Sequence, residues 1–83
     1  MIREKKISYV VASDVNPRDG IGVETYIDGE LVLEIFRDDS ERRTYACLFS
    51  RHVDLDVLEA SIATFKERVG LTYTDYPDDG PQA

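Results

Sequence analysis

The chain has 83 residues, 42% hydrophobic and 33% charged, and its 17 acidic and 10 basic residues give a net charge of −7. This composition is typical of one small folded domain, and its acidity disfavours nucleic acid as the main partner. The single cysteine excludes an intrachain disulfide and the spacing patterns of zinc and iron–sulfur sites. No apolar run approaches the roughly 18 residues that span a bilayer, so we expect a cytoplasmic protein with no membrane segment.

Two strands separated by a loop are predicted in the first third of the chain. Ile7–Ala12 is a short run of residues that favour strands, and the Asn16-Pro17 and Asp19-Gly20 pairs after it are typical of a loop. Ile21–Ile27 then alternates apolar and polar residues, as a half-buried strand does.

The turn at Asp28-Gly29 leads into Glu30–Arg37, the most apolar strand, which we expect at the centre of the sheet. A two-residue turn would set Val23 opposite Glu34, whereas a three-residue loop with the glycine in a bulge would set Val23 opposite Leu33. The second register gives one continuous apolar row, so we predict the bulged three-residue loop.

A fourth strand is predicted at Arg42–Phe49, after a charged turn at residues 38–41. The length of the preceding loop decides which face of this strand joins the core. A four-residue loop would bring in Thr44, Ala46 and Leu48, and a five-residue loop would bring in Tyr45, Cys47 and Phe49. The sequence leaves both alternatives open.

An amphipathic helix is predicted next, because apolar residues recur there at spacings of three and four. These residues are Leu55, Leu58, Ile62, Phe65 and Val69. Asp54 or Asp56 could be the N-cap, and Gly70 could end the helix as the residue after its C-cap.

The order strand, hairpin, hairpin, helix predicts an α+β fold, with a four-stranded antiparallel sheet and one amphipathic helix packed on one face. We assign residues 1–76 to this single domain and expect residues 77–83 to form a mobile tail, since they offer no apolar anchor. A domain of this size has a net stability on the order of 4 to 12 kcal/mol, so self-association would add a useful margin. We therefore expect a homodimer.

No motif predicts catalysis, a metal or a cofactor. Ser50, His52 and Asp54 include the residue types of a hydrolase triad, but closeness in sequence does not give triad geometry, so we interpret them as loop residues. The Gly20-Ile-Gly22 fragment enters a strand, where a phosphate-binding fingerprint must open a helix.

Two other features have a structural interpretation. The Asp38, Asp39 and Glu41 cluster lacks the pattern of a calcium loop, and we interpret it as a solvated hairpin tip neutralised by the arginines beside it. Cys47 lies on a strand and is interpreted as a small, partly buried side chain.

The reverse face of the sheet, away from the helix, is the candidate contact surface, because one helix covers only one face. In the bulged register its candidate interface residues are Glu24, Tyr26, Val32, Glu34 and Phe36. Apolar and aromatic side chains beside carboxylates are typical of the core and rim of an interface. The sequence therefore favours a small acidic, non-catalytic protein–protein interaction module that uses this sheet face, and its acidity would steer it toward a basic partner.

Two alternatives remain open. Tyr26, Phe36 and Tyr45 could stack on the bases of single-stranded nucleic acid, although Glu24 and Glu34 oppose a polyanion. In size, charge and order of elements, the chain is similar to small acidic antitoxin and immunity proteins that neutralise basic toxins. No residue motif carries that likeness, so no functional residue is transferred.

Overall fold

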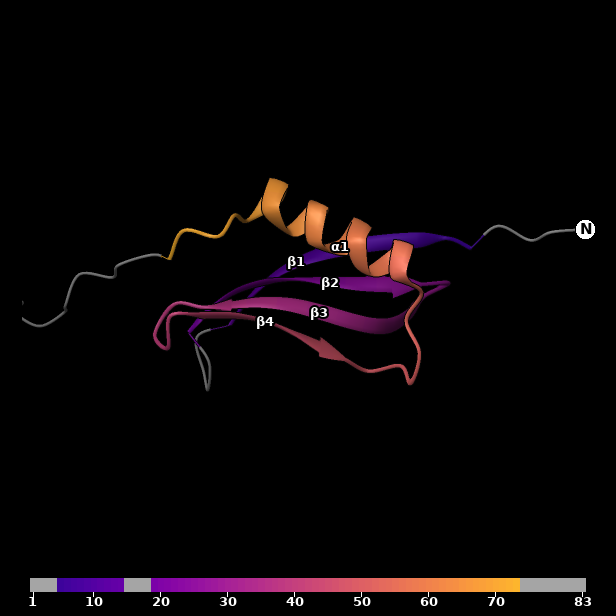
Figure 1. Cartoon of the computed structure of the whole chain (residues 1–83), viewed down its shortest axis with the longest axis horizontal. Coiled ribbons are helices and arrows are strands. Elements are labelled where there is room, and N and C mark those ends of the chain that lie inside the picture. Colours follow the sequence, from indigo (N-terminus) through magenta and orange to yellow (C-terminus); the bar gives the residue numbers. More distant parts are fainter. Residues whose placement is uncertain (1–4, 15–18, 74–83) are drawn as a thin grey trace, which may run out of the picture.

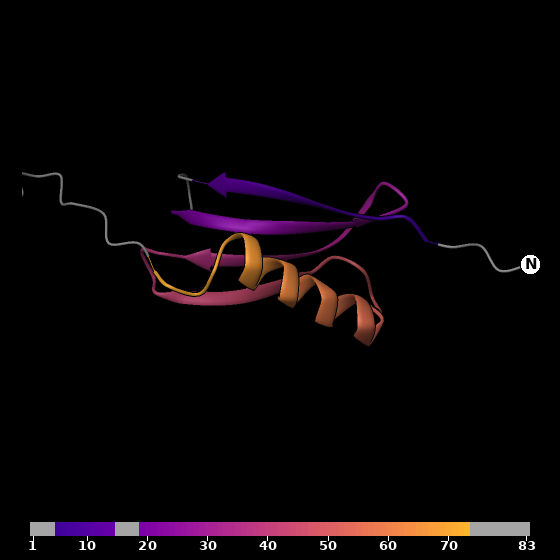
Figure 2. The same cartoon turned by 90° about the horizontal axis from the view of Figure 1, so that it is seen from above.

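The computed structural model describes residues 5–14 and 19–73. It contains four strands followed by one helix. These are β1 (Ile7–Asp14), β2 (Gly20–Ile27), β3 (Glu30–Asp38), β4 (Arg43–Leu48) and α1 (Leu55–Arg68). The strands form one antiparallel sheet in the order β1-β2-β3-β4, and α1 lies on one side of it, against β2 and β3 (Figures 1 and 2).

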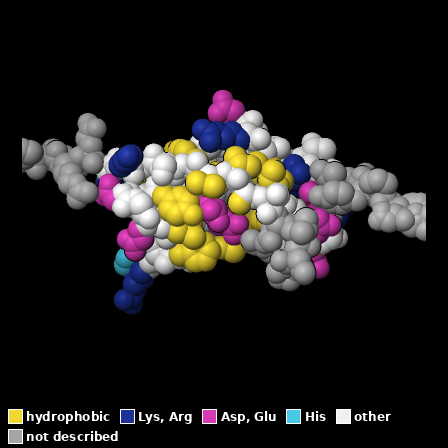
Figure 3. Space-filling model, turned by 180° about the vertical axis from the view of Figure 1, so that it is seen from behind, with side chains coloured by type: hydrophobic (Ala, Val, Ile, Leu, Met, Phe, Trp, Pro, Cys, Tyr) yellow, Lys and Arg dark blue, Asp and Glu magenta, His cyan; other side chains and the backbone are white. Residues whose placement is uncertain are grey.

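This architecture confirms the predicted α+β fold, and β3 is an inner strand as expected. The reverse face, which α1 leaves uncovered, is seen from behind in Figure 3. Because residues directly opposite each other in a sheet share a face, the register assigns six residues used below to the reverse face. They are Val10, Gly22, Glu24, Glu34, Phe36 and Tyr45. The predicted tail at 77–83 and the predicted end of the domain at residue 76 lie outside the described residues.

The turn between β2 and β3 differs from the predicted one. Ile27 pairs with Glu30, so Asp28 and Gly29 form a two-residue turn, and both have positive φ, 53° and 84°. Positive φ at both positions is typical of a type I′ turn, whose twist matches that of the flanking strands. The predicted three-residue loop is therefore wrong.

A bulge occurs instead further along this hairpin, where the register shifts between Thr25 and Tyr26 and leaves Val32 without a partner on β2. Beyond the bulge Val23 pairs with Ile35, two residues from its predicted partner. A shift of two residues preserves the face of every side chain, whereas a shift of one would reverse it. The apolar row beneath the helix is thus preserved, although the turn is shorter than predicted and the bulge lies further along the hairpin.

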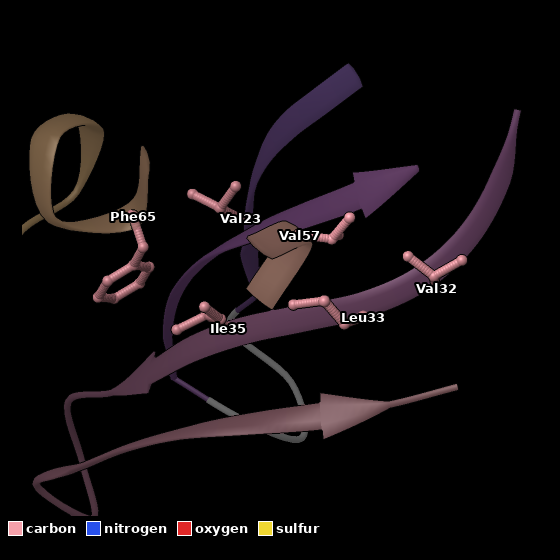
Figure 4. Packing of buried hydrophobic residues seen from close by; sticks show 6 residues of the cluster. All are labelled: Val23, Val32, Leu33, Ile35, Val57 and Phe65. Carbon is pink, nitrogen blue, oxygen red and sulfur yellow. The ribbon is translucent and has the colours of Figure 1, made fainter. Parts of the chain in front are cut away.

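Val32 lies on the helix side of the sheet, contrary to the prediction. It is only 9% exposed and belongs to the hydrophobic core, together with Val23, Leu33, Ile35, Val57 and Phe65 (Figure 4). In a bulge two residues of one strand oppose a single residue of the other, so the strict alternation of faces breaks there. Val32 is therefore not part of the reverse face.

The connection between β3 and β4 decides between the two alternatives for the fourth strand. Asp38 pairs with Arg43, so the loop has the four residues 39–42. Thr44, Ala46 and Leu48 then lie opposite residues of β3 on the helix side of the sheet. The four-residue alternative is confirmed.

The two ends of α1 lie where the sequence predicts. Asp54 is the N-cap residue, but its side chain makes no capping hydrogen bond and its Oδ2 lies 3.2 Å from Lys5 Nζ. Gly70 has a φ of 91°, and its N–H donates to the carbonyl of Phe65 at 2.9 Å. Such a left-handed glycine ends a helix at low cost because it has no Cβ.

The buried line of α1 is rotated from the predicted apolar stripe. Val57, Ser61 and Phe65 are the buried residues of the helix, while Leu55 is 69% exposed and Ile62 is 39% exposed. At the centre of the contact, the hydroxyls of Ser61 and Thr25 share a buried hydrogen bond of 2.8 Å. The stripe is therefore correct for Phe65 and for Leu58 and Val69, which pack against the core, and wrong for Leu55 and Ile62.

The β3–β4 hairpin tip is buried rather than solvated at its first two acids. Asp38 and Asp39 are 6% and 5% exposed, and Arg37 Nε lies 2.8 Å from Asp39 Oδ1. Arg37 Nη1 also donates to the carbonyl of Gly70 at 3.2 Å. This arginine thus ties the tip of the hairpin to the end of α1, where carbonyl groups favour a cation.

Candidate functional site

Two surfaces of the sheet are candidates for binding. The first is the reverse face that the sequence indicates, and Figure 3 shows hydrophobic side chains gathered around acidic ones on this side of the molecule. The second is a groove on the opposite side, between α1 and β4. The two surfaces differ in how many of their side chains are already buried or hydrogen-bonded within the molecule.

Phe36 does not lie open on the reverse face, because it is fully buried. It pairs across the strands with Gly22, and a Cβ at that glycine would lie 2.9 Å from Phe36 Cδ1. On the other side its ring centroid is 6.0 Å from that of Tyr45, at an angle of 49°. The missing side chain of Gly22 therefore gives the phenyl ring its place in the sheet.

Glu34 is also buried, at 7% exposure, and it lies directly opposite Glu24 on β2. Glu24 and Tyr26 are half-buried, and Tyr26 Oη donates a hydrogen bond of 2.9 Å to Glu24 Oε1. This hydrogen bond, more than desolvation and the carboxylate charge, raises the pKa of the Tyr26 phenol. Of the five predicted interface residues, Glu24 and Tyr26 thus remain accessible on the reverse face.

The α1–β4 groove is the second surface. Its lining residues come from β3, β4, α1 and the segment after α1. They are Ile35, Thr44, Tyr45, Ala46, Ile62, Phe65, Lys66 and Leu71. The groove has a volume of about 210 Å³, and nearly all of its lining is apolar. Thr44 Oγ1 is buried there without a hydrogen-bond partner in the described part of the chain.

Two of the residues that line this groove, Ile62 and Leu71, are large hydrophobic side chains that stay exposed. Leu48 of β4 is also exposed and lies on the same side of the sheet. Phe49 and Leu55 are exposed as well, but they do not line the groove. The other three exposed large hydrophobic residues of the described part of the chain lie on β1. Exposed apolar side chains that line one groove of a small domain usually mark a binding surface, whereas single exposed residues do not.

The groove exists because α1 is too narrow for the sheet. A helix with its side chains is about 10–12 Å across, whereas the outer strands of a four-stranded sheet are about 14 Å apart at a spacing near 4.8 Å. α1 packs on β2 and β3, so Ala46 and Leu48 of β4 stay exposed on the helix side. The assumption that one helix covers its whole face made the sequence analysis miss this surface, although strand and helix widths could have indicated it.

Ser50, His52 and Asp54 line a third hollow, of about 240 Å³, at the opposite end of the sheet from the β3–β4 hairpin tip. Ser50 Oγ donates to the backbone carbonyl of His52 at 3.0 Å, and the Asp54 carboxylate pairs with Lys5. A hydrolase triad instead needs the serine hydroxyl on the imidazole and the imidazole on the carboxylate. The contacts present are those of loop residues.

The glycines of the Gly20-Ile-Gly22 fragment lie within β2, opposite Asp38 and Phe36, so this fragment does not open a helix. Over residues 5–14 and 19–73, no group of three or more His, Cys, Asp or Glu side chains is placed to hold a metal ion. In the same residues, no helix has the length and apolar character needed to cross a bilayer.

No protein-family model, curated protein or solved structure matches this chain. Function is therefore inferred from the surfaces of the molecule alone.

Proposed function

We propose that this protein is a small acidic, non-catalytic module that binds another protein through its sheet. The observation that carries the proposal is the α1–β4 groove, whose lining is nearly all apolar and includes the exposed side chains of Ile62 and Leu71. Keeping these side chains in water costs free energy that a partner would recover, at about 25 cal/mol for each Å² of apolar surface buried. The proposed place of action is the cytoplasm, where the free thiol of Cys47 stays reduced.

The reverse face has a smaller part in this proposal than the sequence indicates. Phe36 and Glu34 are already buried, and the Tyr26 hydroxyl is bonded to Glu24. A homodimer that joins two reverse faces would thus gain little apolar contact at the centre. Neutralisation of a basic toxin would be one form of the proposed function, since a net charge of −7 speeds encounter with a basic partner.

Binding of single-stranded nucleic acid is the second candidate function. Three arginines and no acidic residue lie in residues 42–53, which contain β4, and the guanidinium of Arg43 is 5.0 Å from the ring centroid of Tyr45. Such a surface could contact phosphates and bases. It ranks second because Phe36 has no free face for stacking. Salt-sensitive retention on single-stranded DNA would favour it.

The proposal is tested by capturing partners from a lysate of the source cells with three forms of the protein. Ile62→Glu puts a charge on the wall of the groove, and Ala63→Glu puts the same charge on the neighbouring exposed position of α1. We expect a protein that is captured by the wild type and by Ala63→Glu but not by Ile62→Glu. If all three forms capture the same proteins, the groove is not the binding surface.

A further inference from the structure

We infer that the free edge of β4 binds an extended acidic segment of another protein, which adds a fifth strand to the sheet and places apolar side chains in the α1–β4 groove. This inference rests on the proposed function and specifies the binding edge and the chemistry of the partner. It follows from three features of β4: the direction of its backbone groups, the groove beside it and the charges around it.

The backbone of β4 offers hydrogen-bonding groups at its outer edge. Within the described residues β4 pairs with β3 alone, and the N–H of Phe49 donates to the carbonyl of Val32 at 2.9 Å. In an antiparallel ladder only alternate residues bond to the neighbouring strand. The N–H and C=O groups of Thr44, Ala46 and Leu48 therefore point away from β3. An extended peptide can pair with these groups, as in other cases of strand addition.

The same three residues direct their side chains to the helix side, where the groove lies. A fifth strand would run about 4.8 Å beyond β4, and every second side chain of it would point to that side. There it would meet Ile62 and Leu71, which are 39% and 52% exposed. The partner segment is therefore expected to carry an apolar residue at every second position.

The charges around β4 select an acidic partner. Residues 42–53 contain no acidic residue, although the whole chain carries a net charge of −7. Arg43 at the start of β4 and Arg51 after its end supply the basic groups, and Asp38 of β3 lies opposite Arg43. Lys66 adds a basic group on the wall of the groove. Asp54 is the first acidic residue after this segment, but its carboxylate forms an ion pair with Lys5 at 3.2 Å. The acidic residues between the apolar ones of the partner would point to the reverse side of the sheet, where the register places Arg43.

A second copy of the chain fits this edge less well. Antiparallel pairing of β4 with itself would bring the Arg43 end of one copy to the Arg51 end of the other, and like charges would meet at both ends of the new ladder. The phosphates of a nucleic acid could bind the arginines. A nucleic acid has no backbone amide groups to pair with the edge of β4, however, and no apolar side chains to fill the groove. An extended protein segment can pair with the outward backbone groups of β4, fill the groove and complement the charges around the strand.

The test begins with a random dodecapeptide phage library selected on the wild-type protein. We expect enriched peptides with Asp or Glu alternating with apolar residues. Synthetic versions should bind about tenfold or more weakly to Ile62→Glu and to Ala46→Pro, and within about twofold of wild type to Ala63→Glu. Proline at residue 46 removes an outward N–H, which an edge strand tolerates.

A measurement on the unmodified protein keeps the test independent of these variants. On peptide binding, the amide protons of Thr44, Ala46 and Leu48 should become protected from hydrogen exchange, whereas that of Val11, which points outward from the opposite edge strand β1, should not change. Unchanged exchange at the three β4 amides in a saturated complex overturns the inference.

Several outcomes contradict the inference without touching the proposed function. Enriched peptides that are basic or lack alternation overturn it, and so does displacement of the peptide by oligo-dT at lower concentration. A wild-type dimer in sedimentation that Ala46→Pro converts to monomer overturns it in favour of a second copy. If no peptide is enriched while Ile62-dependent capture of a lysate protein persists, the inference fails and the proposed function stands. Loss of that capture instead removes the proposed function.

Discussion

The reverse face and the α1–β4 groove show that cover by a helix is a poor guide to which side of a sheet is open. In the described part of the chain no helix lies on the reverse face, yet Phe36 is fully buried there between Gly22 and Tyr45. The opposite face carries α1, yet Ile62 and Leu71 stay exposed beside β4. On the first surface Phe36 is packed between its cross-strand neighbours, whereas on the second the width of the helix leaves the side chains beside β4 open.

The largest expected effect tests whether the reverse face is closed by its own packing. Phe36→Ala should lower the free energy of unfolding by about 3–5 kcal/mol, the usual cost of deleting a buried phenyl ring. Phe49→Ala is the matched control, because Phe49 is 56% exposed and should change stability by no more than about 0.5 kcal/mol. Urea unfolding measures both values. Equal costs for the two variants would mean that the reverse face is not packed as described.

A smaller loss of stability is expected when the space above Gly22 is filled. In Gly22→Ala the new Cβ would lie 2.7 Å from the carbonyl oxygen of Ile35 and 2.9 Å from Phe36 Cδ1. Either the strand or the ring must move, which should cost about 1–3 kcal/mol in the same unfolding experiment. A variant as stable as the wild type would show that Phe36 does not depend on this glycine.

At the groove, the change in stability should be smaller still. Ile62 is 39% exposed, so Ile62→Glu should shift the free energy of unfolding by about 1 kcal/mol or less, even though it abolishes partner capture. Thermal unfolding followed by circular dichroism provides the check. A loss comparable to that of Phe36→Ala would show that Ile62 belongs to the core and that the groove is closed in solution.

The smallest effect concerns the hydrogen bond between Tyr26 and Glu24. Its acceptor raises the pKa of the Tyr26 phenol above the ordinary value of 10.0, so Glu24→Gln should lower that pKa. The folded protein holds this proton more tightly than the unfolded chain does. The stabilising contribution is therefore full below about pH 10 and is lost as the pH rises through the higher pKa of the folded state.

An NMR titration of the Tyr26 ring in both proteins measures this shift. Identical titration curves would mean that the hydrogen bond does not form in solution and that the reverse face is less well satisfied than described.

Much of the fold could be predicted from local patterns in the sequence. The Asp28-Gly29 turn, the apolar run of β3 and the glycine after α1 each act over a few residues, so their positions and the order of elements follow from the sequence. The bulge at Val32 could not be predicted in this way. It depends on how β2 and β3 twist against each other beneath α1, which no local pattern records.

The candidate site was harder to predict than the fold, because it depends on where α1 docks. The apolar periodicity of the helix predicts Leu55 and Ile62 as buried, but the hydroxyl pair of Ser61 and Thr25 occupies the centre of the contact. Periodicity measures which side of a helix is apolar, not which part of that side meets the sheet. Of the two exposed residues of the stripe, Ile62 lines the groove.

The most direct test of the central claim compares two exposed apolar residues on opposite sides of the sheet. Ile62 lines the groove at 39% exposure, and Val10 lies on the reverse face at 45% exposure. We predict that Ile62→Glu abolishes binding of the captured partner in isothermal titration calorimetry, whereas Val10→Glu binds as the wild type does. Loss of binding in Val10→Glu with retention in Ile62→Glu would contradict the account and return the binding surface to the reverse face.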